Sequence, residues 1–144
     1  MKKTLFTDGW MYGLKGEAKR PVILPHDAMQ LQEREPEAKS SSGGAWFPGG
    51  IYTYEKRWIA GEEYADQRLI LHFEGVYRNT LVRVNGVPVG GKHYGYAPFW
   101  LDITDAVKTG EENLIEVEAD NSEIPNSRWY TGGGIYRPVW LLSA

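Results

Sequence analysis

Carboxylic acids are the most numerous side chains with catalytic potential, because the chain has 19 acidic residues and no cysteine. Glu62-Glu63 and Glu111-Glu112 form adjacent pairs in turn-like segments, while Glu116 and Glu118 alternate along an expected strand. Paired carboxylic acids can act as general acid and general base in hydrolytic enzymes. Charged side chains in turns and on polar strand faces are usually solvated, so we expect surface charge here and no catalytic pair.

The three histidines, His26, His72 and His93, are scattered without the spacing of metal ligands. The sequence therefore predicts no metal site and no catalytic residue, and the glycine clusters lack the following Lys-Ser or Lys-Thr of a phosphate loop, so no cofactor is expected. His26-Asp27 follows Leu24-Pro25 and has two readings. The two side chains form a buried hydrogen-bonded pair, or they face a binding site.

Aromatic side chains make up 13% of the chain, and several stand beside expected loops. Rings in loops can stack on the C–H face of a sugar, whereas large aromatic residues more often fill a core or pack on a neighbouring domain. Both readings stay open for the three clusters, which are Trp46-Phe47, Tyr94-Gly95-Tyr96 and Trp129-Tyr130.

Length and charge set the broad class. A chain of 144 residues suits one domain, 1–144, and a net charge of −3 does not fit a nucleic-acid partner. No apolar run approaches the roughly 20 residues of a membrane helix, so no membrane partner is expected. The first residues lack the apolar core of a secretory signal, which predicts a cytoplasmic location.

Alternation of apolar and polar residues predicts an all-β fold. Leu69, Leu71 and Phe73 point to one side of a strand and His72 to the other, and Asn85-Gly86 between apolar runs signals a hairpin. Successive short strands joined by turns indicate a two-sheet antiparallel β-sandwich of the jelly-roll type, with less than a fifth of the residues helical. The expected core residues are Leu69, Leu71, Phe73, Val82, Val84, Ile115, Val117 and Trp140.

Several motifs in order resemble the N-terminal sugar-binding domain of family 2 glycoside hydrolases, the β-galactosidase- and β-glucuronidase-like enzymes. The resemblance covers about Leu24 to Leu142. Its motifs are Leu24-Pro25-His26-Asp27, Phe47-Pro48-Gly49-Gly50-Ile51-Tyr52, Phe73-Glu74-Gly75-Val76, Val84-Asn85-Gly86, Gly95-Tyr96-Ala97-Pro98-Phe99, Asn113-Leu114-Ile115-Glu116-Val117, Ser127-Arg128-Trp129-Tyr130 and Gly134-Ile135-Tyr136-Arg137.

The resemblance implies a galactose-binding-domain-like jelly roll that precedes an immunoglobulin-like domain and a catalytic barrel. It also implies that this chain is the N-terminal part of a larger glycosidase, with the remaining domains and a carbohydrate substrate as partners. The barrel's acid/base glutamate follows an asparagine in this family, and no Asn-Glu dipeptide occurs here. We therefore expect the isolated domain to be inactive, and a homo-oligomer of the full-length enzyme stays open.

In this family the last loop of the first domain can reach the substrate. An aspartate that precedes the Gly-Ile-aromatic-Arg motif contacts the sugar in several members, and the same spacing here ends on Arg128. The sequence departs from the family pattern at this position, and Asn126, Arg128 and Trp129 remain the candidates in this loop for binding the substrate, beside His26 and Asp27. Two alternatives remain, a free-standing carbohydrate-binding module and a purely structural domain for contacts between domains or subunits.

Overall fold

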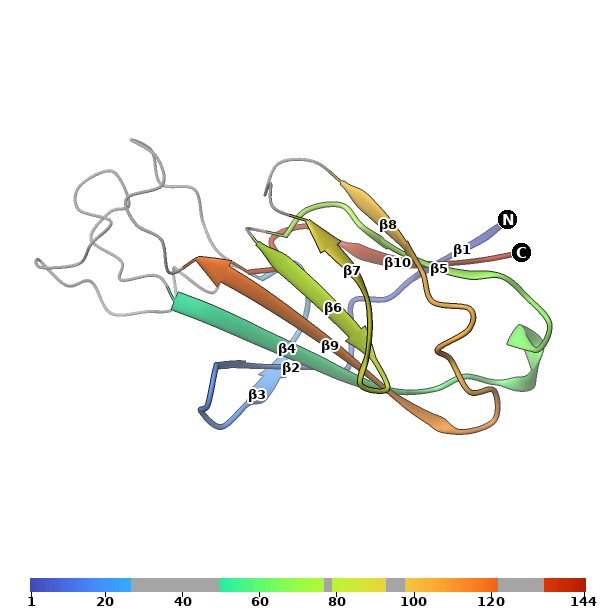
Figure 1. Cartoon of the computed structure of the whole chain (residues 1–144), viewed down its shortest axis with the longest axis horizontal. Coiled ribbons are helices and arrows are strands. Elements are labelled where there is room, and N and C mark those ends of the chain that lie inside the picture. The colour runs from blue at the N-terminus through green and yellow to red at the C-terminus, as the bar shows by residue number, and fades with distance from the viewer. Residues whose placement is uncertain (27–49, 77–78, 93–97, 122–133) are drawn as a thin grey trace, which may run out of the picture.

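The chain folds into two antiparallel sheets (Figure 1). Side chains that alternate along the strands form one core between the sheets. This computed structural model describes residues 1–26, 50–76, 79–92, 98–121 and 134–144. The strands are β1 (Lys2–Leu5), β2 (Trp10–Leu14), β3 (Arg20–Val22), β4 (Gly50–Ile59), β5 (Leu69–Phe73), β6 (Thr80–Val84), β7 (Val87–Lys92), β8 (Phe99–Asp102), β9 (Glu112–Asn121) and β10 (Val139–Ser143).

One sheet has four strands in the order β1-β10-β5-β8, and the other has six in the order β3-β2-β4-β9-β6-β7. Every pair of neighbouring strands within each sheet is antiparallel. Within the described ranges the only helical element is a single turn of 3₁₀ helix, η2 (Glu62–Tyr64). The predicted all-β, two-sheet antiparallel sandwich is confirmed.

The sequence pattern does not predict the first three strands. β1 is polar and mostly exposed, and β3 has only three residues, including Pro21. β2 carries Trp10 and Tyr12 inward, but its place depends on pairing with β4, whose Tyr54 lies opposite Tyr12. Because that pairing spans more than forty residues of chain, the local pattern does not reveal it.

The predicted Asn85-Gly86 hairpin is present, with positive φ at both turn residues, 51° and 79°. Buried Asn113 fixes this turn from below. Its Oδ1 accepts hydrogen bonds from Asn85 Nδ2 and the Lys108 amide, both at 2.8 Å, and its Nδ2 donates to the Lys108 and Glu111 carbonyls at 3.0 Å. One side chain thus ties the hairpin to the connection before β9.

Seven of the eight predicted core residues are buried between the sheets, and Trp140 is the exception. The inward residues of β10 are Val139 and Leu141, so Trp140 lies on the outer face of the four-stranded sheet. The prediction for Trp140 was wrong because β10 reads as a continuous apolar run, which contains no alternation to set the phase.

β4 and β9 run side by side along the whole sandwich and define its two ends. Gly50 pairs with Asn121 at one end, and Ile59 pairs with Glu112 at the other. Ten extended residues span roughly 33 Å. η2 and both termini lie at the end that contains Ile59 (Figure 1).

Candidate functional site

His26 is the one candidate site residue among the described residues, and backbone contacts hold it against the middle of β4. The chain leaves β3 and turns inward at buried Leu24, whose amide donates to the Thr7 carbonyl at 3.0 Å. Two residues later the His26 amide donates to the Ile135 carbonyl at 2.7 Å. This backbone hydrogen bond therefore connects the chain just before residue 27 to the chain just after residue 133.

The His26 side chain meets Tyr54, which points inward from the middle of β4. Nδ1 of His26 lies 2.8 Å from the Tyr54 hydroxyl, and the same hydroxyl accepts the Ile135 amide at 3.3 Å. Because Oη already accepts that N–H, its own proton is available to a neutral Nδ1. One buried phenol thus connects β4 to both flanking segments.

Gly134 is required by this arrangement. Its φ is +76°, and a Cβ at this position would lie 2.0 Å from the Tyr54 oxygen. A larger residue would have to push the phenol away from its two partners, and it would also adopt a backbone conformation that L side chains rarely take. The glycine therefore lets the chain approach Tyr54 closely enough for the Ile135 contact.

Tyr12 completes the cluster from β2. Its ring lies 4.6 Å from the His26 ring and 5.3 Å from the Tyr54 ring, measured between centroids. Burial raises the pKa of Tyr12, and the Arg20 guanidinium, 5.8 Å from the ring centroid, partly offsets that rise. The phenol stays neutral near pH 7, so Tyr12 packs the cluster and does not titrate.

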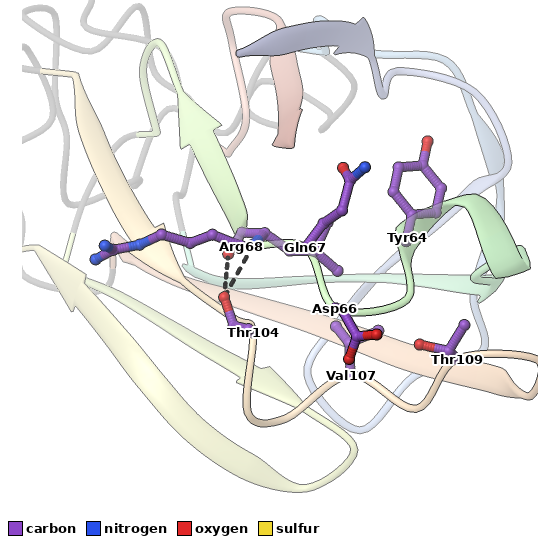
Figure 2. A pocket seen from close by; sticks show the side chains of 8 residues that line it. Tyr64, Asp66, Gln67, Arg68, Thr104, Val107 and Thr109 are labelled. Atoms are coloured by element: carbon purple, nitrogen blue, oxygen red, sulfur yellow. Dashed lines mark hydrogen bonds between the residues drawn. The ribbon is translucent and has the colours of Figure 1, made fainter. Parts of the chain in front are cut away.

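A separate hollow of about 360 Å³ lies near η2 (Figure 2). The side chain of Thr104 organises it, donating to Asp102 Oδ1 at 2.6 Å and accepting the Leu69 amide at 2.9 Å. Hydrogen bonds from Thr104, and then the Arg68 guanidinium 3.1 Å from Oδ2, lower the pKa of Asp102. These contacts fix a turn, and we assign no chemistry to the hollow.

Comparison with known proteins identifies the family. The chain is 43% identical over 122 residues to a β-galactosidase of Bacteroides ovatus, across 85% of this chain and 14% of that protein. It is 39% identical over 136 residues to a β-glucuronidase of Bacteroides fragilis, across 90% of this chain and 18% of that protein.

Solved structures agree. A family 2 glycosyl hydrolase of Bacteroides cellulosilyticus superposes with a TM-score of 0.92 and 30% identity, over 100% of this chain and 21% of that one. A β-glycosidase of Bacteroides vulgatus gives 0.91 and 30%, over 100% and 20%. The chain is homologous to one domain of family 2 glycoside hydrolases. No protein-family model matches the chain.

The family 2 domain spans only about a seventh to a fifth of these relatives. Four of its five predicted site residues, Asp27, Asn126, Arg128 and Trp129, lie outside the described residues. The described residues that flank these segments nevertheless converge, since His26 and Ile135 are hydrogen-bonded and Gly50 pairs with Asn121. The His26 side chain is half-buried and hydrogen-bonded to Tyr54. Its predicted pairing with Asp27 lies outside the described residues, so both readings of His26-Asp27 stay open.

Tyr54 and Tyr12 were missed as site residues. The only signal for Tyr54 was its place just after the motif from Phe47 to Tyr52, and its pairing with His26 could not be foreseen from spacing. Of the acidic residues expected to be solvated, Glu62, Glu63, Glu111 and Glu112 are exposed, whereas Glu116 and Glu118 are half-buried. Glu118 pairs with Lys15 at 2.9 Å and Glu112 with Arg57 at 3.1 Å on the outer face of the six-stranded sheet.

Among the described residues no group of three or more His, Cys, Asp or Glu side chains could hold a metal ion. None of the helical segments described is long and apolar enough to cross a membrane.

Proposed function

We propose that this chain is the non-catalytic N-terminal domain of a family 2 glycosidase, which packs on the catalytic barrel and helps to shape its substrate pocket. The observation that carries the proposal is that His26 and Ile135 are both bound to Tyr54. His26 lies directly before segment 27–49 and Ile135 follows segment 122–133, and these two segments contain the other candidate sugar contacts. We call His26, Tyr54 and Ile135 the Tyr54 anchor.

The role of the Tyr54 anchor is to hold the neighbouring backbone in position. It contains no acid–base pair with the geometry of a glycosidase, whose two carboxyl groups stand roughly 5–10 Å apart across the bond. Hydrogen bonds around a buried phenol instead fix where the neighbouring backbone starts, and small displacements of contacting groups reduce transition-state binding strongly. In this proposal Asn126, Arg128 and Trp129 contact the sugar, and the Tyr54 anchor sets the position of their segment.

The experiment compares two hydroxyl deletions in the full-length enzyme. Tyr54→Phe removes the hydroxyl that binds Nδ1 of His26 and the Ile135 amide. Tyr64→Phe is the matched control, because its hydroxyl has no hydrogen bond among the described residues and lies by the hollow near η2. We expect Tyr54→Phe to lower kcat/KM by about tenfold, equivalent to ~1.4 kcal/mol, and Tyr64→Phe to leave it unchanged.

Arg128→Ala tests the contact itself. A guanidinium can make two parallel hydrogen bonds to a carboxylate or to neighbouring hydroxyls, so its loss should raise KM or lower kcat/KM by about tenfold or more while the melting temperature stays constant. Unchanged kinetics for both Arg128→Ala and Tyr54→Phe would mean that the Tyr54 anchor and the segment that contains Arg128 are only structural connections. The isolated chain should hydrolyse no glycoside.

A further inference from the structure

The outer side of the four-stranded sheet carries a continuous row of apolar and aromatic residues. Leu5 pairs with Trp140, Trp140 with His72, and His72 with Trp100, so the row crosses all four strands in register. Trp100 is 56% exposed and Leu5 is 52% exposed. Together with Ile70 and Leu142 on the neighbouring row, these residues form what we call the aromatic face: Leu5, Ile70, His72, Trp100, Trp140 and Leu142.

Contacts within the aromatic face already hold its rings in place. The His72 ring stacks on Trp100 with centroids 4.6 Å apart and planes 12° apart. The Lys3 ammonium sits 4.2 Å from the Trp140 ring centroid, and the Trp140 indole donates to Glu74 Oε2 at 2.6 Å. Rigid side chains of this kind lose little conformational entropy when a partner covers them.

The same contacts argue against a sugar platform. A pyranose stacks on an open ring face, but His72 covers one face of Trp100 and Lys3 covers one face of Trp140. The indole N–H is already bound to Glu74, so it cannot donate to a hydroxyl without breaking that bond. What the surface offers is apolar area, which suits a protein partner.

We infer that the aromatic face is the docking surface for another domain of the same polypeptide, which presents an apolar patch with a carboxylate opposite Lys3. The inference rests on the proposed function and specifies the side on which this domain is held. Burial of exposed apolar area contributes roughly 25 cal/mol per Å², and an exposed Lys beside the patch would favour an acidic rim on the partner.

Patch size favours a tethered occupant over a second copy of the chain. Two half-exposed and four partly exposed side chains present on the order of a few hundred Å², less than the ~800 Å² per partner of a typical stable interface. A covalently linked domain needs less area, because its effective concentration is about millimolar. The relatives are several times longer than this chain, and β10 belongs to this sheet, so polypeptide joined at Ala144 would be tethered beside the aromatic face.

Residue-resolved hydroxyl-radical footprinting tests the inference on the isolated chain and on the full-length enzyme. We expect labelling of Trp100 to fall about fivefold or more in the full-length enzyme, as for a ring that enters the desolvated centre of an interface. Val87, which is 52% exposed on β7 of the other sheet, is the internal reference and should be labelled equally in both. Trp100→Glu in the full-length enzyme should restore labelling of Leu5, whereas Val87→Glu should not.

Three results would overturn the inference. The first is equal labelling of Trp100 in both proteins, and the second is a dimer of the isolated chain that already protects Trp100. The third is protection of Trp100 in the isolated chain by a soluble oligosaccharide. The proposed function fails in a different way. A full-length protein that protects Trp100 but has no glycosidase activity would refute the function alone, and an active enzyme with an accessible Trp100 would refute the docking alone.

Discussion

The outer faces of the two sheets are built on the same alternation but carry opposite chemistry. On the six-stranded sheet the outward residues of β4, β6 and β9 include Arg57, Arg83 and Glu118, which form ion pairs such as Arg57–Glu112 at 3.1 Å. On the four-stranded sheet the outward row is Leu5, Trp140, His72 and Trp100. The first composition suits water and the second suits protein.

This contrast indicates that the inward-facing residues of each strand determine the sandwich fold, while the outward-facing residues determine what each sheet contacts. Both sheets bury their inward residues completely at the centre, with Phe73 and Ile115 at 0% exposure. Nothing in the shared core requires an exposed Trp100 on one side and a Glu118 ion-pair network on the other. The asymmetry is therefore a property of the surface, and surface function explains it better than folding does.

The largest expected effects test whether the two sheets are equivalent on the inside. Phe73→Ala in the four-stranded sheet should lower the free energy of unfolding by about 3–5 kcal/mol, and Ile115→Ala in the six-stranded sheet by about 2–5 kcal/mol. Both would be measured by urea denaturation of the isolated chain. A loss below ~1 kcal/mol for either would mean that its sheet contributes little to the core.

Much of this inner architecture could be predicted, because alternation reports burial directly. Leu69, Leu71 and Phe73 were assigned correctly because the polar residues Arg68, His72 and Glu74 at the alternate positions set the phase. Trp140 was not, because Val139, Leu141 and Leu142 around it are all apolar. Strand pairing and outer-face chemistry depend on residues far apart in sequence, so the row from Leu5 to Trp100 could not be recognised before the register was known.

A smaller effect is expected on the charged side. Glu118 lies 2.9 Å from Lys15 and 3.8 Å from Arg83, and all three side chains are at least partly exposed. Glu118→Gln should therefore cost only about 0.2–1 kcal/mol, and the difference from wild type should shrink between 20 mM and 500 mM salt as screening increases. Trp100→Ala in the same isolated chain is the matched control, whose cost should be independent of salt.

The candidate site shows the same limit on prediction from sequence. His26 was singled out by its motif, but its partner Tyr54 stands 28 residues away on a strand whose inward phase had to be known first. Gly134 fits only because the Tyr54 oxygen occupies the space that a Cβ would take. Such a fit is a property of packing, and no local pattern contains it.

The smallest expected effect concerns His72, at the centre of the aromatic face. Burial, and then the nearby Lys3 ammonium, lower the pKa of His72, while Glu74 opposes them. A histidine whose folded pKa lies below the ordinary value binds a proton more weakly in the folded state than in the unfolded state. The free energy of unfolding should therefore fall as the pH drops below about 6.5, and should be unaffected by this group above that value.

His72→Gln isolates this contribution from that of the other histidines. If the sign is right, the stability difference between wild type and His72→Gln shifts against wild type as the pH falls from 7.5 to 5 in urea denaturation of the isolated chain. Docking of a partner over Trp100 would bury the His72 ring further. In the full-length enzyme this would lower the pKa of His72 more, because a more desolvated imidazole resists protonation more strongly. A pH profile that His72→Gln leaves unchanged would mean that the stack on Trp100 is open to water, which would also weaken the contrast between the two faces.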